Sequence, residues 1–278
     1  MVIDFHTHCF PPKIAAATLG KLSAMSRTVP FTDGTPIGLM DSMANAGIDM
    51  SVILPVATNP LKVSEINDLS INKTGKNGLV YFGCMHPDCP DWSGELERIA
   101  GAGLSGIKLH PVYQRVDFDD IRFLRIMEKA GELGLVVITH AGWDIGFPGV
   151  SCCTPQMVLS AIKQAGPVKL VLAHMGGWRC WDEAEELLAG TGVYIDTSFS
   201  GGFLTPRPDV SMSEEEKALL TADKFTHIIR SFGAGKVLFG TDSPWSDQTE
   251  ALSWLNSLPL TGEEKRAILS ENAKALLF

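Results

Sequence analysis

The 278-residue chain is predicted to fold as a single (β/α)8 TIM barrel, an α/β architecture. Short apolar segments alternate with helix-like segments along the chain, the pattern that parallel strands joined by helices produce. Eight such apolar segments occur, and the chain length suits this barrel, which typically has about 250 residues. The glycine-rich fingerprint of an open dinucleotide-binding sheet is missing after the first segment. Because no linker or composition shift interrupts the chain, we expect one domain over residues 1–278.

The apolar segments are bounded by turn-forming residues, and the helical segments show the apolar period of a helix. The predicted strands are residues 1–8, 50–56, 79–86, 106–110, 135–140, 168–174, 193–198 and 236–242. The predicted helices are residues 36–46, 61–74, 93–102, 118–133, 154–165, 178–189 and 222–232, with two more beginning near 247 and 262. Residues 9–35 contain Pro11, Pro12, Pro30 and Gly34, and we expect them to be irregular.

Composition excludes several classes of partner. The formal net charge is −9 and Lys and Arg form no cluster, so we expect neither nucleic acid nor an anionic membrane as a partner. No apolar segment approaches the length of a transmembrane helix, and the chain opens on a strand rather than on a signal peptide. The 6 cysteines form no CxxC pair, which favours free thiols over a structural zinc site. These features predict a cytoplasmic protein.

The first strand carries Asp4, His6 and His8, each two residues from the next. Residues two apart in a strand point to the same face, so this element directs a carboxylate and two imidazoles to one place. Imidazole is a common ligand of zinc and similar metals. Two chance histidines in a buried strand would look the same, and this stretch alone does not separate the two interpretations.

The positions of the other histidines favour the metal. Of 7 histidines, only His227 lies inside a predicted helix; His6, His8, His86, His110, His140 and His174 lie at or near strand ends, and Asp242 ends the eighth strand. The carboxyl ends of barrel strands line the active-site mouth. We therefore expect His6, His8, His140, His174 and Asp242 to meet in one funnel. His86 and His110 precede prolines and are interpreted as structural rather than as ligands.

Five motifs resemble the amidohydrolase superfamily, and more closely its amidohydrolase-related branch, which includes aminocarboxymuconate-semialdehyde decarboxylase. They are DFHTH (4–8), GIKLHP (106–111), ITHAG (138–142), LAHMGG (172–177) and FGTDSPW (239–245). The resemblance implies a TIM barrel that holds zinc or another divalent metal, one per chain, and a homodimer. It implies that His6, His8, His140 and Asp242 are the metal ligands. It also implies that His174 is a catalytic acid or base, or a ligand of a second metal.

Lys108, at the end of the fourth strand, has two interpretations. Some members of the superfamily carbamylate a lysine there, which then bridges two metals. An unmodified ammonium group has no lone pair for a metal. We favour an unmodified Lys108 that pairs with a substrate carboxylate or with a neighbouring acid.

The site predicts a hydrolase. A divalent metal lowers the pKa of a bound water to roughly 7, and Asp242 is placed to take the proton from that water. His174 would polarise a carbonyl group or serve as a base, so a small-molecule amide, ester or lactone is the expected substrate. The alternative is non-oxidative decarboxylation, with Lys108, Arg115 and Arg179 as cations for carboxylates. A barrel that binds a metal or ligand without turnover is a second alternative, which the complete ligand set disfavours.

Two loops are expected to select the substrate. Residues 143–153 carry aromatic side chains, and residues 199–212 have the glycine and proline content of a lid or of a partner contact. Trp143, Phe147 and Trp245 would form an apolar wall, with Trp143, Lys108 and Arg115 as substrate contacts. These features favour a small planar or apolar-bodied substrate over a polymer.

Overall fold

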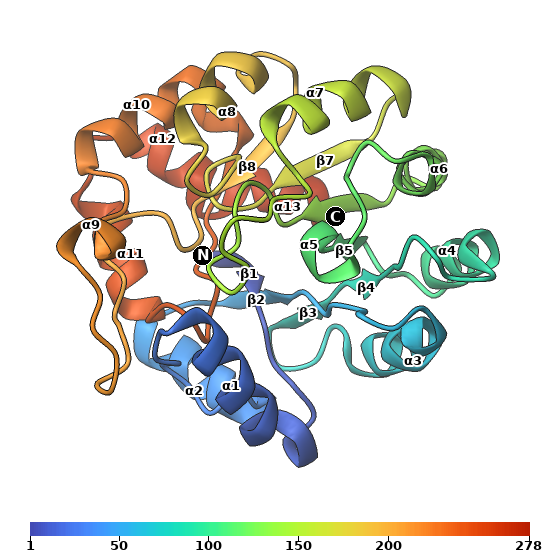
Figure 1. Ribbon diagram of the computed structural model, residues 1–278, viewed down its shortest axis with the longest axis horizontal. Helices are drawn as coiled ribbons and strands as arrows, with labels where there is room; N and C mark the ends of the chain where they lie inside the picture. Colours follow the sequence, from blue (N-terminus) through green and yellow to red (C-terminus); the bar gives the residue numbers. More distant parts are fainter.

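The computed structural model describes all 278 residues and forms a ring of parallel strands surrounded by helices (Figure 1). The strands are β1 (Ile3–Thr7), β2 (Met50–Ile53), β3 (Leu79–Tyr81), β4 (Gly83–Cys84), β5 (Gly106–Leu109), β6 (Val136–Thr139), β7 (Lys169–Leu172), β8 (Tyr194–Asp196) and β9 (Val237–Leu238). Strands β3 and β4 both lie in the single predicted strand at 79–86. Phe82 between them donates its backbone N–H to the Ile53 carbonyl, so the two short strands continue one line of the barrel.

The barrel is closed by contacts between its first and last strands. The sheet β1-β2-β3 and the sheet β4 to β9 are parallel throughout. The Phe5 N–H donates to the Phe239 carbonyl at 2.7 Å, and the Asp242 N–H donates to the His6 carbonyl at 2.8 Å. Counting β3 and β4 as one line, eight strands form the ring, and the predicted (β/α)8 barrel is confirmed.

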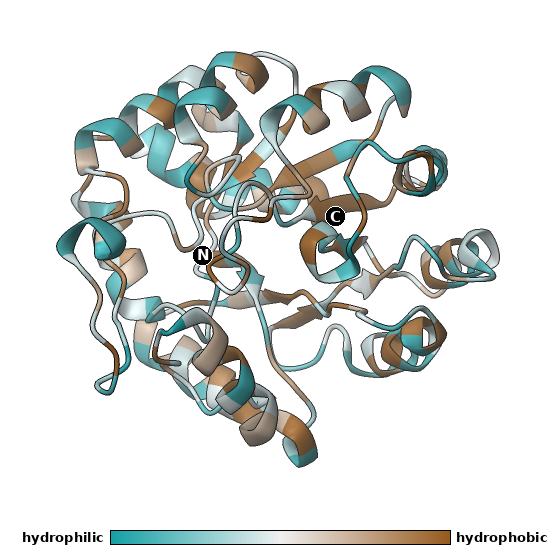
Figure 2. Cartoon of the chain, viewed as in Figure 1, coloured by the Kyte–Doolittle hydropathy of each residue, from teal (hydrophilic) through white to brown (hydrophobic).

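Most of the helices cover the outside of the ring, and the C-terminal helix lies across one end of it. The helices are α2 (Pro36–Ala46), η1 (Pro60–Lys62), α3 (Val63–Lys73), α4 (Trp92–Gly101), α5 (Pro111–Gln114), α6 (Ile121–Glu132), α7 (Pro155–Gln164), α8 (Trp181–Leu188), α9 (Glu214–Lys217), α10 (Ala222–Phe232), η2 (Ala234–Lys236), α11 (Gln248–Ser257), α12 (Gly262–Arg266), the π-helix η3 (Ala267–Glu271) and α13 (Asn272–Leu277). Predicted helices 118–133 and 178–189 begin later than expected, at Ile121 and Trp181. The strands are the most continuously hydrophobic elements (Figure 2).

The core has two layers because alternate strand residues point to opposite faces. Inside the ring, Ile3 and Phe5 of β1 pack with Val136 and Ile138 of β6. The C-terminal helix α13 adds Leu276 to this cluster and so covers one end of the barrel interior. A larger cluster fills the space between the strands and the outer helices. The opposite end of the ring is left free for the cleft described below.

One sequence prediction is wrong: residues 9–35 are not all irregular. They contain α1 (Pro12–Ser26), a helix of 15 residues. Pro12 is its first residue, where the missing N–H and fixed φ of proline favour a helix start rather than prevent one. The alanines and leucines that follow have high helix propensity. Arg27, with φ 63°, ends the helix in the left-handed conformation.

The loop at 199–212, predicted to be a lid or a partner contact, packs within the chain against the segment that follows α1. The Val29 N–H donates to the Thr205 carbonyl at 3.2 Å, and the Arg207 N–H donates to the Arg27 carbonyl at 2.9 Å. Arg27 also pairs with Glu216 at 2.9 Å. These contacts fix the position of α1 at the barrel mouth. None of the helices combines the length and hydropathy that crossing a membrane requires.

Candidate metal centre

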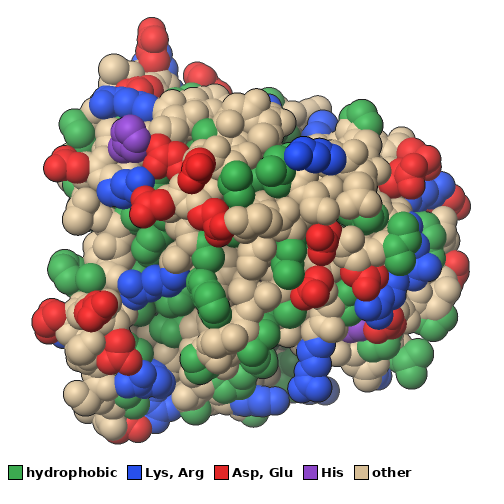
Figure 3. Space-filling view, turned by 45° about the horizontal axis from the view of Figure 1, so that its top comes forward, with side chains coloured by type: hydrophobic (Ala, Val, Ile, Leu, Met, Phe, Trp, Pro, Cys, Tyr) green, Lys and Arg blue, Asp and Glu red, His purple; other side chains and the backbone are tan.

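A cleft of about 1070 Å³ opens at the carboxyl ends of the strands. Its inner wall carries His6, His8, His140, His174 and Asp242, so the predicted funnel exists. Its outer walls come from α1, α3 and the loop that follows β6. On the face of the molecule shown in Figure 3, hydrophobic side chains gather in the lower half, and charges of both signs are interspersed around them.

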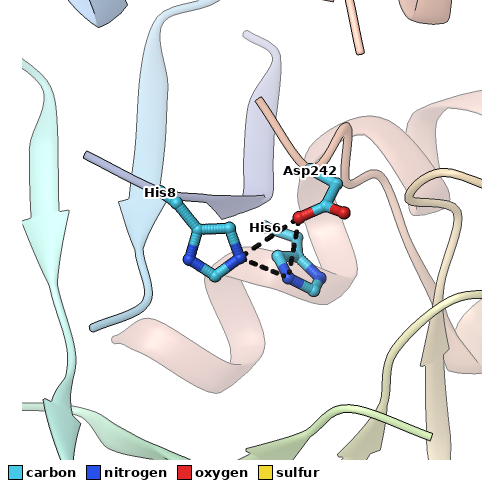
Figure 4. Close-up of side chains that lie close together, drawn as sticks. All are labelled: His6, His8 and Asp242. Atoms are coloured by element: carbon cyan, nitrogen blue, oxygen red, sulfur yellow. Dashed lines mark hydrogen bonds and ion pairs between the residues drawn. The ribbon is translucent and has the colours of Figure 1, made fainter. Parts of the chain in front are cut away.

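His6, His8 and Asp242 form the tightest cluster in this cleft (Figure 4). The Nε2 atoms of His6 and His8 lie 3.2 Å apart. Asp242 Oδ1 lies 3.1 Å from His8 Nε2 and 3.5 Å from His6 Nε2. His6 belongs to β1, His8 follows it directly, and Asp242 follows β9. The junction that closes the barrel therefore assembles all three ligand atoms.

Hydrogen bonds on the far side of each ring fix which nitrogen carries a proton. His6 Nδ1 lies 2.7 Å from Asp196 Oδ2, and His8 Nδ1 lies 2.8 Å from the Leu54 carbonyl oxygen. Because both partners are acceptors, each Nδ1 must donate, and a neutral ring then has its lone pair on Nε2. Both lone pairs face Asp242. Three electron-rich atoms thus converge without a proton between them.

The charges in the cluster suit a dication. Burial, and then Lys108, holds the pKa of His6 well below its usual value, so the ring is neutral. Burial raises the pKa of Asp242, and positive charge on the adjacent His6 and His8 rings lowers it below the usual range; with both rings neutral, a bound dication would supply that charge and keep the carboxylate ionised. Metal–ligand bonds of about 2.0–2.1 Å in a tetrahedral site place ligand atoms about 3.3–3.4 Å apart, close to the separations in this cluster. These three residues fit a zinc-like metal.

His140 and His174 pair with each other. His140 Nδ1 lies 3.0 Å from His174 Nε2. His140 Nε2 lies 2.9 Å from the carbonyl oxygen of Trp143, to which it donates. Neither nitrogen of His140 is directed at the cluster of His6, His8 and Asp242, and the role of His140 as a metal ligand stays a prediction.

Asp196 connects the cluster to His174, and the sequence argument did not single it out. It is fully buried at the end of β8. Its Oδ2 accepts from His6 Nδ1, and its Oδ1 accepts the His174 N–H at 2.9 Å and the Ser198 hydroxyl at 2.5 Å. Ser198 Oγ in turn lies 2.9 Å from His174 Nδ1. A carboxylate at a strand end was the available signal, the same one that identified Asp242.

Asp4 has a different place from the two histidines of its strand. It accepts hydrogen bonds from the Thr241 hydroxyl at 2.6 Å and from Gln248 Nε2 at 2.7 Å. It also accepts the His6 N–H at 3.2 Å. Asp4 therefore holds the backbone on both sides of the cluster and does not contribute a ligand atom to it. Burial raises its pKa to about 7.

The three predicted substrate contacts all line the cleft. Lys108 is 1% exposed, and its Nζ lies 3.4 Å from His6 Nε2. Burial lowers the pKa of Lys108 to about 8, although nearby carboxylates oppose the shift. Arg115 and Trp143 are exposed at the mouth. The site thus has a cation at its inner wall and another at its rim.

His110 and Asp144 stand beside the cluster. The His110 ring stacks on His140, with centroids 4.5 Å apart, and on Tyr113, with centroids 3.9 Å apart. Its Nε2 lies 3.6 Å from Asp144 Oδ2. His110, His140 and Asp144 also lie close enough together to hold a metal ion, so the structural role expected of His110 stays a prediction. Asp144 was missed because it lies in a loop.

The remaining histidines lie outside the cluster. His86 Nδ1 accepts the Asp88 N–H at 3.1 Å, a local turn contact. His227 on α10 is exposed and lies 2.8 Å from Glu185. Both agree with the structural and surface roles expected of them.

Several solved structures share the fold. A 5-carboxyvanillate decarboxylase from Sphingomonas paucimobilis is 16% identical, with 99% of this chain and 98% of that chain covered and a TM-score of 0.68. A Pseudomonas putida protein provisionally named 2-pyrone-4,6-dicarboxylic acid hydrolase is 17% identical, with coverage of 99% and 97% and a TM-score of 0.63. A 5-carboxyvanillate decarboxylase from Novosphingobium aromaticivorans, with bound manganese, is 12% identical, with coverage of 100% and 97% and a TM-score of 0.68.

No curated protein sequence matches the chain. A family model described as amidohydrolase matches residues 3–278, almost the whole chain. The five motifs, the barrel and the His–Asp cluster at its mouth agree with that match. The chain is a member of the amidohydrolase family of metal-dependent enzymes.

Proposed function

We propose that this protein is a metal-dependent, non-oxidative decarboxylase of a small unsaturated or aromatic carboxylic acid. One zinc or other divalent ion per chain would be held by His6, His8 and Asp242. The neighbours named as decarboxylases support this choice over the hydrolase expected from the sequence.

The observation that carries the proposal is the set of cations in the cleft. Lys21, Lys73, Lys108 and Arg115 line it, and none of them forms an ion pair with a carboxylate. The chain as a whole has a formal net charge of −9. Free cations gathered in one cleft of an acidic protein favour an anionic substrate. Lys108, buried beside His6, is placed to pair with the carboxylate of that substrate.

The chemistry follows from these positions. A divalent metal, when bound, supplies positive charge that orients the oxygen atoms of the substrate and stabilises negative charge on them. The bond between the substrate carbon and its carboxyl group breaks, the electron pair stays on that carbon, and carbon dioxide leaves. That carbon takes up a proton, for which His174 is the candidate donor. Because His140 Nε2 donates to the Trp143 carbonyl, His140 Nδ1 accepts from His174 Nε2 at 3.0 Å and orients that ring, and water entering the cleft supplies the proton that restores His174 after each turnover.

Hydrolysis is the second candidate, because Asp242 is ionised at the cluster and could act as the base for water. The two reactions differ in their products. We would incubate the zinc- and manganese-loaded protein with a panel of 2-hydroxybenzoates and pyrone carboxylates, and measure carbon dioxide against ring-opened acids.

Decarboxylation predicts one carbon dioxide per substrate consumed. It also predicts loss of turnover in Lys108→Met and His8→Ala but not in Lys163→Met, which changes an exposed lysine on α7 outside the cleft. Ring-opened acid without carbon dioxide would overturn the proposal in favour of the hydrolase. A metal-loaded protein that binds these acids without any turnover would favour the non-catalytic barrel.

A further inference from the structure

Helix α1 has two apolar faces, although a surface helix normally needs one. Ala15 and Leu19 form the buried face, where Leu19 lies against Gly34. Ile14, Ala17, Leu22 and Met25 recur every three to five residues along a second stripe, and all four line the cleft. Gly146, in the loop that follows β6, lies against Met25 at one end of this stripe, whereas Ile14 at the other end is 50% exposed.

Helix α3 repeats the arrangement on the other side of the cleft. Its buried face includes Val63 and Asn67. Ile66 and Leu69 lie on an adjacent face that lines the cleft, and Leu69 is 41% exposed. Glu65, the acidic residue among the α3 residues that line the cleft, is already paired with Lys62 at 2.6 Å. The two helices therefore present apolar side chains to one cavity, interspersed with Thr18 and Lys21 of α1 and Ser70 and Lys73 of α3.

We call this part of the cleft the α1–α3 groove and define it by Ile14, Ala17, Leu22, Met25, Ile66 and Leu69. It belongs to the same cavity of about 1070 Å³ as the metal cluster. A cavity of about 150 Å³ holds a benzene ring, so a single aromatic acid at the cluster would leave most of the space open. From Ile14 to Met25 the helix rises about 16 Å. The groove is long enough for an extended group.

We propose that the α1–α3 groove is a subsite for an apolar extension, alkyl or aryl, of the acid whose carboxyl group is held at the metal cluster. The inference rests on the proposed function for the position of the carboxyl group. Water against the exposed Ile14 and Leu69 side chains is released when such a group is bound, which favours binding. The substrate class is then an aromatic or unsaturated acid with an apolar tail, not a bare ring acid.

The test is direct binding, measured by calorimetry on the metal-loaded protein. The probes are 4-alkylbenzoates from methyl to butyl, and the matching 4-alkylbenzyl alcohols, which lack the carboxylate. We expect each added methylene to tighten binding by up to about fourfold. Ile14→Asp and Leu69→Asp should abolish this gain and leave the affinity for 4-methylbenzoate nearly unchanged. Ile121→Asp changes an apolar residue that is 70% exposed outside the cleft, and it should keep the gain.

The outcomes separate the subsite from the proposed function. Affinity that does not depend on alkyl length, or a gain that survives both substitutions, overturns the subsite. If His8→Ala weakens the binding of the benzoates while alkyl length has no effect on their affinity, the proposed function stands without the subsite. If benzoates and alcohols bind alike but the gain is lost in Ile14→Asp, the subsite stands and the function fails. A dimer that Ile14→Asp and Leu69→Asp convert to a monomer would show that a second copy covers the groove, which also overturns the subsite.

Discussion

The properties of single residues at this site depend on their hydrogen bonds more than on their identity. Two histidines two residues apart in a strand are an ordinary sequence feature. Here Asp196 and the Leu54 carbonyl fix the tautomer of each ring, so both Nε2 lone pairs face one carboxylate. The sequence could predict the histidines because they end strands. It could not predict the partner of His6, because that contact joins residues that are 190 apart.

Asp196 should therefore control the affinity for the metal. We expect Asp196→Asn to weaken metal binding by about 10–100-fold, because the ring of His6 loses the carboxylate that holds its orientation and tautomer. Competition with a chelator of known affinity measures the change. Ser200→Ala is the matched control, since the Ser200 hydroxyl donates to the Ser198 carbonyl and forms no hydrogen bond with Asp196 or His6. Metal affinity in Asp196→Asn equal to that of the wild type would refute this role.

At the scale of elements, the boundaries depend on local contacts that patterns describe incompletely. Helix α6 starts at Ile121 rather than at 118 because the Asp120 side chain accepts the Arg122 N–H at 2.9 Å. At α1 a helix was not predicted at all, because the prolines at 11 and 12 were interpreted as signs of irregular structure. Pro12 in fact begins the helix. The periodicity of the strands was the stronger signal, and it predicted the barrel correctly.

The Asp120 side chain that caps α6 is expected to stabilise the folded protein. Asp120→Ala should lower the free energy of unfolding by about 1 kcal/mol, as loss of a cap commonly does, whereas Asp119→Ala should have little effect. Hydrogen bonds from the Arg122 side chain and N–H lower the pKa of Asp120 to about 2. The Asp120 charge therefore makes its full contribution to the free energy of unfolding above the unfolded-state pKa of about 3.9. This contribution is lost as the pH falls toward 2.

Urea unfolding of the wild type and Asp120→Asn between pH 2 and 6 measures this charge, since asparagine keeps the cap. The two proteins should differ at pH 6 and converge at the acid end. A difference that persists unchanged at low pH would contradict the assignment.

At the scale of the whole molecule, barrel closure and the metal cluster are the same structure. His6 lies in the first strand, His8 directly follows it, and Asp242 follows the last strand. The alternating pattern predicted the ring, and the position of histidines at strand ends predicted the mouth. Two features could not be predicted: the pairing of His140 with His174, and the cleft wall formed by α1. Both depend on tertiary contacts between segments far apart in the sequence, which local sequence patterns do not specify.

Removal of the metal should therefore lower the thermal stability of the barrel. A ligand that binds only the folded state at one hundred times its Kd adds about 2.7 kcal/mol of stability. For a chain of this size, that corresponds to a fall in Tm of roughly 5 °C when a chelator removes the metal. Asp242→Ala should melt at a similar temperature with and without chelator. A wild-type Tm that chelation does not change would show that the metal does not contribute to closure.

The central claim is that His6, His8 and Asp242 hold one divalent metal per chain. Elemental analysis of protein purified without chelator or histidine tag tests it most directly, with His6→Ala and Asp242→Ala analysed in parallel. The account predicts about one metal per wild-type chain and almost none in either variant. Metal content that is unaffected by both substitutions would contradict it. Two metals per chain would also contradict it, and the second ion would then have two candidate groups, His6, His174 and Asp196 or His110, His140 and Asp144.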